Sequence, residues 1–151
     1  MTDVELTGYC GLYCGDCIRY KSKASSLAKD LLKELEVTQF GDYAKVKQSQ
    51  IPDFKNYEIM MKLLRHISQL SCEVSCRQGG DGCIDSCRII ECVKEKYFEG
   101  CWECDDYVTC EKLEFLKPFH GDTPVNNLHK IKELGTHAWA KHRGKCYPWS
   151  K

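Results

Sequence analysis

Residues 72–110 read CEVSCRQGGDGCIDSCRIIECVKEKYFEGCWECDDYVTC, and they hold eight of the chain's twelve cysteines. These eight are Cys72, Cys76, Cys83, Cys87, Cys92, Cys101, Cys104 and Cys110. Thiols spaced this closely either crosslink or bind a soft metal ion. Because the same stretch contains few aliphatic residues, a hydrophobic core alone does not hold it together. We therefore expect bound metal to organise this segment.

A second cysteine motif lies near the start of the chain. Residues 10–17 read CGLYCGDC, which brings Cys10, Cys14 and Cys17 close together in the sequence. Gly11 and Gly15 allow the positive φ angles of a tight turn that points neighbouring sulfurs at one ion. We expect these three thiols to be metal ligands as well.

The charge and the expected compartment narrow the possible functions. The 22 basic residues balance the 22 acidic ones, so no overall field attracts nucleic acid or an anionic membrane. The sequence has no signal-peptide pattern and no apolar run of membrane-spanning length, which predicts a cytoplasmic protein without a membrane partner. Structural disulfides are rare in that reducing compartment, so the cysteine pattern favours metal ligation over crosslinks.

Two helices are predicted between the cysteine motifs. Apolar residues recur at helical spacing over residues 27–35, behind an N-cap at Ser25 or Ser26, and Gly41 lies at or soon after the end of this helix. A second helix is predicted from about Asp53 to Leu70, with one apolar face. That face consists of Tyr57, Met60, Met61, Leu64 and Ile67, with His66 near its edge as a packing residue.

The centre of the cysteine-rich stretch predicts a turn followed by a short helix. Residues 78–82 read QGGDG, a turn that lacks the Lys-Ser/Thr ending of a phosphate loop. Asp85 or Ser86 is expected to cap a helix carrying Ile89, Ile90, Val93 and Tyr97, with Cys87 in its first turn. Cys87 and Cys92 lie about 140° apart around such a helix, so the sequence leaves open whether they share an ion.

The end of the same stretch carries the strongest local metal signal. Cys101 and Cys104 form a CxxC knuckle in which two sulfurs meet one tetrahedral ion, and Trp102 is expected to shield the site. Cys110 is expected at the start of another short helix.

The C-terminal part predicts one further helix and a basic tail. Thr123 and Pro124 are typical of an N-cap and first helical position, and Gly135 of the C-terminal end. Residues 141–145 are expected to be a solvated basic end. Cys146 is either spare or completes a site, and a catalytic role for it with His137 or His142 has no supporting motif.

The spacing also resembles that of iron–sulfur proteins. Cys10, Cys14 and Cys17 have the CxxxCxxC spacing of radical S-adenosylmethionine enzymes, but the chain lacks the length and the alternating strands of their barrel. Cys101, Cys104 and Cys110 resemble part of the auxiliary cluster motif of the same superfamily. All-thiolate sets suit both zinc and iron, so an iron–sulfur cluster remains the alternative.

Most of the chain resembles a family of small cysteine-rich bacterial and archaeal proteins, domain of unknown function 3795. The shared motifs are residues 10–17 with Tyr20, Cys76-Arg77, residues 83–96, residues 101–104, residues 110–113 and the closing segment 127–139. Thr109 stands where the family usually has proline, and Cys72 and Cys76 are spaced more widely than its usual CxxC. The resemblance implies metal binding and no assigned reaction.

Together these patterns predict a mainly α protein, a small irregular helical domain over residues 1–151 with cysteine-rich loops held by metal sites. Two or more zinc ions are the expected cofactors, and the alternative is an iron–sulfur redox or accessory protein. The favoured role is structural and non-catalytic, with a surface for an unidentified protein partner. The expected ligands are the cysteines of both motifs: Cys10, Cys14, Cys17, Cys72, Cys76, Cys83, Cys87, Cys92, Cys101, Cys104 and Cys110.

Overall fold

The structure is a computed structural model that describes residues 1–80, 82–84, 86–144 and 147–149. The chain forms two compact units, and each is described by itself. The first unit comprises residues 1–21 and 72–151, and the second comprises residues 22–71. Because residues 22–71 contain no cysteine, every thiol of the chain belongs to the first unit. The expectation of one domain over residues 1–151 stays a prediction.

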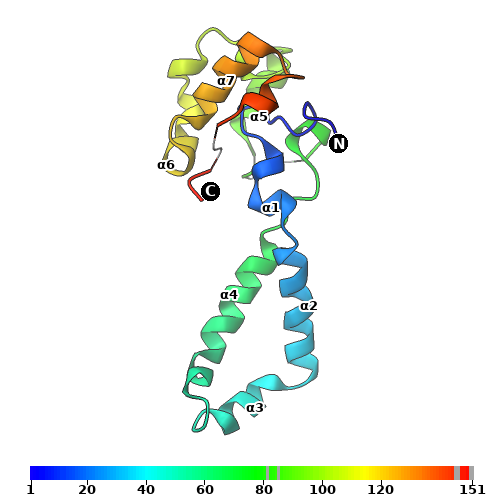
Figure 1. The fold of residues 1–151 in the computed structure, drawn as a ribbon, viewed down its shortest axis with the longest axis vertical. Coiled ribbons are helices and arrows are strands. Elements are labelled where there is room, and N and C mark those ends of the chain that lie inside the picture. Colours follow the sequence, from blue (N-terminus) through cyan, green and yellow to red (C-terminus); the bar gives the residue numbers. More distant parts are fainter. Residues whose placement is uncertain (81, 85, 145–146, 150–151) are drawn as a thin grey trace. The chain divides into compact units, whose positions relative to one another are not determined.

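The prediction of a mainly helical protein is confirmed. The α-helices are α1 (Ile18–Lys21), α2 (Ala24–Val37), α3 (Phe40–Lys47), α4 (Tyr57–Gln69), α5 (Arg88–Glu95), α6 (Lys117–His120) and α7 (Thr123–Leu134) (Figure 1). Short 3-10 helices span Cys14–Asp16, Pro52–Asn56, Cys76–Gln78, Cys101–Glu103, Tyr107–Thr109, Glu111–Leu116 and Trp139–His142. Within the described residues there is no β-strand, only an isolated bridge between Thr7 and Tyr13.

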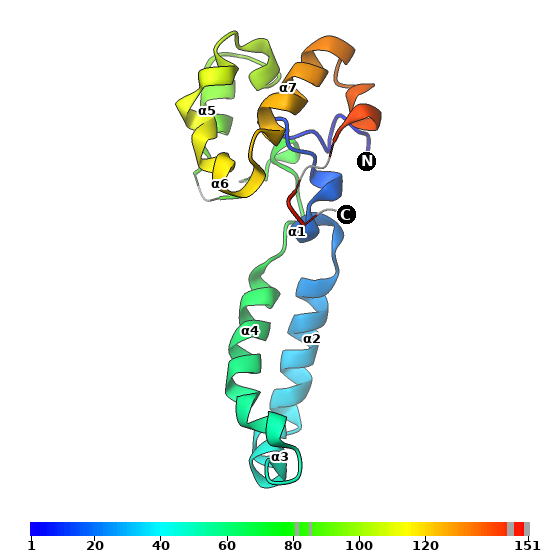
Figure 2. The same ribbon diagram turned by 60° about the vertical axis from the view of Figure 1, so that its left-hand side comes forward.

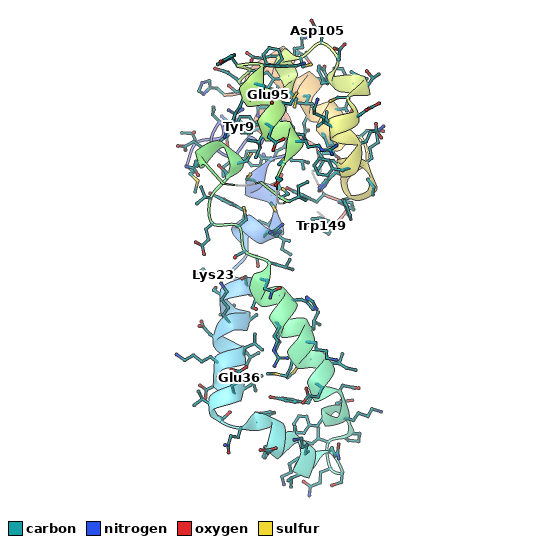
Figure 3. The ribbon with its side chains drawn as sticks, turned by 180° about the vertical axis from the view of Figure 1, so that it is seen from behind. Tyr9, Lys23, Glu36, Glu95, Asp105 and Trp149 are labelled. Atoms are coloured by element: carbon teal, nitrogen blue, oxygen red, sulfur yellow. The ribbon has the colours of Figure 1, made fainter. Side chains whose placement is uncertain are left out.

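The second unit is a helical hairpin in which α2 and α4 lie side by side (Figures 1 and 2). Ala28, Leu35 and Met61 are buried where the two helices pack. Side chains from both helices project into the space between them, and Lys23 and Glu36 mark the two ends of α2 (Figure 3). The hairpin therefore has an apolar core of its own.

The predicted cap and burial of α2 are wrong in detail. Its N-cap is Lys23, whereas Ser25 lies inside the helix, where it is buried and its hydroxyl donates a 2.7 Å hydrogen bond to the carbonyl oxygen of Ser68. Leu27 lies on the apolar stripe of the sequence but is 63% exposed. A serine near a helix start can thus make a tertiary hydrogen bond instead of capping the helix, because its hydroxyl can donate to a carbonyl oxygen that is distant in the sequence.

The turn of the hairpin contains a helix that the sequence did not indicate. Gly41 follows the end of α2, as expected, but it lies inside α3. The second predicted helix ends at Gln69, as expected, but α4 begins at Tyr57 because a 3-10 helix occupies residues 52–56. Phe40, Phe54 and Tyr57 form ring contacts across this turn, which stabilise it through aromatic packing. Met60 is 38% exposed, so only Met61 fills the core as expected.

The first unit packs its core around α7. Leu128, Ile131 and Trp139 are fully buried there, together with Ile89 and Val93 of α5. The predicted cap of α7 is wrong by one residue: Asp122 is the N-cap, Thr123 begins the helix and Pro124 occupies its first turn. Gly135 is the C-cap with a φ of 76°, a conformation that glycine adopts without strain.

The C-terminal segment holds the N-terminal loop in place. The Trp139 indole Nε1 donates a 3.0 Å hydrogen bond to Thr7 Oγ1, and the Asn127 amide Nδ2 donates a 2.9 Å hydrogen bond to the carbonyl oxygen of Gly11. The expectation of a solvated basic tail is wrong for Arg143, which makes two hydrogen bonds to the carboxylate of Asp16. These contacts fix the loop that carries the first cysteine motif.

No helix in the described part of the chain is long and apolar enough to cross a membrane.

Candidate metal centres

Two cavities of the first unit contain the cysteines. The first has a volume of about 60 Å³, and we name it the seven-thiol cavity. Its lining includes Cys10, Cys14, Cys17, Cys72, Cys76, Cys83 and Cys87. The second has a volume of about 210 Å³, and we name it the four-thiol cavity. Its lining includes Cys92, Cys101, Cys104 and Cys110. All eleven cysteines of the described residues thus fall into one set or the other, with none shared.

The N-terminal loop folds so that its thiols point into the seven-thiol cavity. The loop reverses direction between Gly8 and Leu12, where the Gly8 amide donates a 2.7 Å hydrogen bond to the Leu12 carbonyl. Gly11 has a φ of 83°, and a Cβ atom there would lie 2.9 Å from the carbonyl oxygen of Pro124. Glycine is therefore required at this position both for the turn and for the close approach of α7. The 3-10 helix Cys14–Asp16 then continues the loop.

The segment from Cys72 to Cys87 closes the same cavity from the other side. The Cys72 amide donates a 3.0 Å hydrogen bond to the Arg19 carbonyl, and the buried Ser75 hydroxyl donates a 2.9 Å hydrogen bond to the Glu5 carbonyl. Arg19 Nη1 donates a 2.9 Å hydrogen bond to the carbonyl oxygen of Cys83. These bonds bring two parts of the chain that are distant in sequence to the same thiol cluster.

Arg77 joins the N-terminal loop to the turn that precedes Cys101. Its Nε donates to the carbonyl of Thr7 and its Nη2 to the carbonyl of Glu99, both at 2.6 Å. Its guanidinium group also lies 4.8 Å from the ring centroid of Tyr9, which is labelled in Figure 3, and 5.0 Å from that of Trp102. A planar group between two aromatic rings gains cation–π energy from both while it donates hydrogen bonds in its own plane.

We expect Arg77→Ala to destabilise the first unit by about 2–4 kcal/mol, because it removes two charged hydrogen bonds and two cation–π contacts. Arg77→Lys should recover only part of this loss, since an ammonium group lacks the planar fork. Chemical unfolding measures both, and the matched control is Arg88→Ala, at an exposed arginine of α5. Equal stability of the Arg77→Ala and Arg88→Ala proteins would contradict the role given to Arg77.

The four-thiol cavity is built from α5 and the turns that follow it. Cys92 lies within α5, and Cys101 and Cys104 bracket a 3-10 turn in which the Cys104 amide donates a 3.1 Å hydrogen bond to the Cys101 carbonyl. Cys110 is the N-cap of the 3-10 helix Glu111–Leu116, as the sequence predicted for a helix start. The Lys96 ammonium group lies 3.8 Å from Cys104 Sγ.

Cys87 and Cys92 line different cavities. Cys87 lines the seven-thiol cavity and Cys92 the four-thiol cavity. Cys87 is the N-cap of α5 instead of a residue of its first turn, and Ser86 precedes it with a φ of 56°. Asp85, the other expected cap, lies outside the described residues.

A sequence family covers the part of the chain that contains the two cavities. The sequence model of a family described as protein of unknown function (DUF3795) matches residues 6–115, which is well over half of the chain. The chain belongs to the DUF3795 family. The residues matched by the DUF3795 model include all eleven cysteines of the two cavities. No curated protein and no solved structure matches the chain.

Burial sets the protonation of the thiols in this DUF3795 protein. Burial and the neighbouring thiols raise the pKa of Cys14 and of Cys101 to about 12, and that of Cys83 to about 11. Burial also raises the pKa of Cys10 well above its usual value. Without a cation these thiols are therefore protonated at neutral pH, since a cluster of buried thiolates would be desolvated and mutually repulsive.

The spacing of the sulfur atoms decides whether the cysteines could hold a metal ion without moving. Among the described residues, no three His, Cys, Asp or Glu side chains are grouped closely enough to hold a metal ion as they stand. The loops therefore bring the thiols to two common cavities without closing a coordination sphere. Ligation requires the sulfurs within each cavity to move closer together.

Several residues around the cavities were not indicated by the sequence. Arg19 donates a hydrogen bond to the carbonyl oxygen of Cys83, and Arg77 supports the N-terminal loop. Tyr147 lines the seven-thiol cavity and is buried, with its pKa raised by burial and by its neighbour Cys17. The position of Arg77 next to Cys76 was the one available signal, because cations near thiolates stabilise them. His137 and His142 are exposed, and Cys146 lies outside the described residues.

Proposed function

We propose that this DUF3795 protein is a zinc-binding protein in which the two thiol cavities are structural metal sites. The observation that carries the proposal is that the eleven cysteines of the described residues all line one or the other of two cavities. Four cysteines are the complete ligand set of a closed tetrahedral zinc site, as the four-thiol cavity supplies. A reducing compartment such as the cytoplasm keeps such thiols available for metal.

The local structure around the cavities supports a structural role. Outside α5, the cysteines lie on loops, 3-10 turns and helix ends, which gain little stability from their own hydrogen bonds. Cys10, Cys17, Cys87, Cys101 and Cys110 are partly buried against the hydrophobic core. Structural zinc contributes on the order of 10 kcal/mol in small peptides, which is comparable to the net stability of a domain. Metal in these cavities would thus fasten the loops to the core.

An iron–sulfur cluster is the second candidate, because four thiols in one cavity also suit a four-iron cluster. Elemental analysis and a visible absorbance spectrum of protein prepared without oxygen separate the two. We expect at least two zinc ions per chain and no visible band. Stoichiometric iron with sulfide and a visible band would show that the protein binds an iron–sulfur cluster instead of zinc. Protein that folds without either metal would contradict metal binding altogether.

We expect metal affinity to fall as the pH is lowered from 8 to 6. Burial holds the pKa of Cys14 and Cys101 at about 12 in the metal-free protein, so each ligating thiol must lose a proton when metal binds at neutral pH. Competition titrations with a chromophoric chelator at several pH values measure the affinity, and the unbuffered solution should acidify on zinc addition. An affinity independent of pH would contradict thiolate ligation.

A further inference from the structure

The seven-thiol cavity contains more ligands than one zinc ion uses. A single tetrahedral ion takes four thiolates, which would leave three of the seven thiols unused. Two separate tetrahedral ions would need eight thiolates. Two ions that share one bridging thiolate need seven. The cysteine count of this cavity therefore fits a bridged pair.

The thiols of this cavity come from two separate parts of the chain. A Cβ atom on Gly8 would lie 3.6 Å from Cys10 Sγ and 3.9 Å from Cys76 Sγ, so both sulfurs lie beside the same residue. The N-terminal loop and the segment from Cys72 to Cys87 thus contribute thiols to one cluster.

The charge around the cavity suits a strongly anionic cluster. Two divalent ions with seven thiolates carry a net negative charge, and two arginines lie beside them. Arg19 binds the Cys83 carbonyl, while its buried Nε has no hydrogen-bond partner within the described part of the chain. Arg77 follows Cys76 directly in the chain. Cations beside thiolates offset the charge that the metal ions leave.

The cavity is also too small for an organic ligand. Its volume of about 60 Å³ is well below the roughly 300 Å³ of a small-molecule site. A group of metal ions that draws the sulfurs inward needs no larger space.

We propose that the seven-thiol cavity binds two divalent metal ions joined by one bridging thiolate, so that the whole chain binds three. This inference rests on the proposed function, because it assigns a nuclearity to one of the two metal sites. The four-thiol cavity then holds a single, isolated ion.

The test is cadmium NMR on the full chain loaded without oxygen with an NMR-active cadmium isotope, alongside native mass spectrometry. Cadmium is a soft substitute for zinc at thiolates. We expect three bound ions, with two resonances split by coupling to each other through the shared sulfur and one unsplit. Cys104→Ser should weaken only the unsplit resonance, which serves as the control for assignment.

The outcomes separate the inference from the proposed function. Two bound ions without cadmium–cadmium coupling would overturn the bridged pair and keep two thiolate sites. Three ions without coupling would also overturn the bridge, since an eighth ligand would then complete separate sites. Protein that binds no cadmium would overturn the proposed function itself.

Discussion

Replacing Cys104 by serine is expected to lower the metal content by one ion and the Tm by at least about 10 °C. The four-thiol cavity would keep three thiolates, which bind zinc more weakly than four. Because metal binding and folding are coupled in such sites, the lost binding energy appears as lost stability of the first unit. Elemental analysis and calorimetry on the same preparation measure the two losses together.

The control is Cys146→Ser, at the one cysteine outside the described residues. We expect this variant to keep its metal and to change the Tm far less. A Cys104→Ser protein that retains its metal and fold would show that the four-thiol cavity is not a metal site. A Cys146→Ser protein that loses metal as severely would show that the ligand sets extend beyond the two cavities.

Removal of metal with a chelator is expected to unfold the cysteine-rich loops while the helical hairpin stays folded. The hairpin contains no cysteine and has its own buried residues, Ala28, Leu35 and Met61. The segment from Cys72 to Cys110 depends on thiols placed on turns and helix ends. Hydrogen exchange should therefore show protection lost by several orders of magnitude in residues 72–110 and largely retained in α2 and α4.

The metal-loaded protein in the same buffer without chelator is the reference for this experiment. Re-addition of zinc should restore protection in residues 72–110 and leave the hairpin unchanged. Uniform loss of protection along the whole chain would contradict a local structural role for the metal. Full protection after complete metal removal would contradict a structural role altogether.

The sequence predicted the helical class and the cysteines that line the two cavities, because short stretches of sequence are enough to recognise both. Close spacing indicates clustered thiols, and apolar periodicity indicates α2 and α4. The partition of the thiols into sets of seven and four was not predictable. It depends on where α5 turns Cys92 away from Cys87, and the spacing of those two residues left their pairing open.

The supporting residues escaped prediction for a related physical reason. Arg77 binds carbonyls of Thr7 and Glu99, which are distant from it in the chain, and Arg143 binds Asp16 across an even longer separation. The position of Arg77 next to Cys76 was the only local signal for it, and Arg143 had none. The caps of α2 and α7 were wrong because serine and threonine near a helix start serve equally well as caps, first-turn residues or tertiary donors.

X-ray absorption at the zinc edge measures whether the metal in the two cavities is bound through cysteine sulfur. We expect a first shell made only of sulfur, at about 2.3 Å from zinc. A first shell containing nitrogen or oxygen at about 2.0–2.1 Å, or purified and folded protein that contains no metal at all, would contradict it.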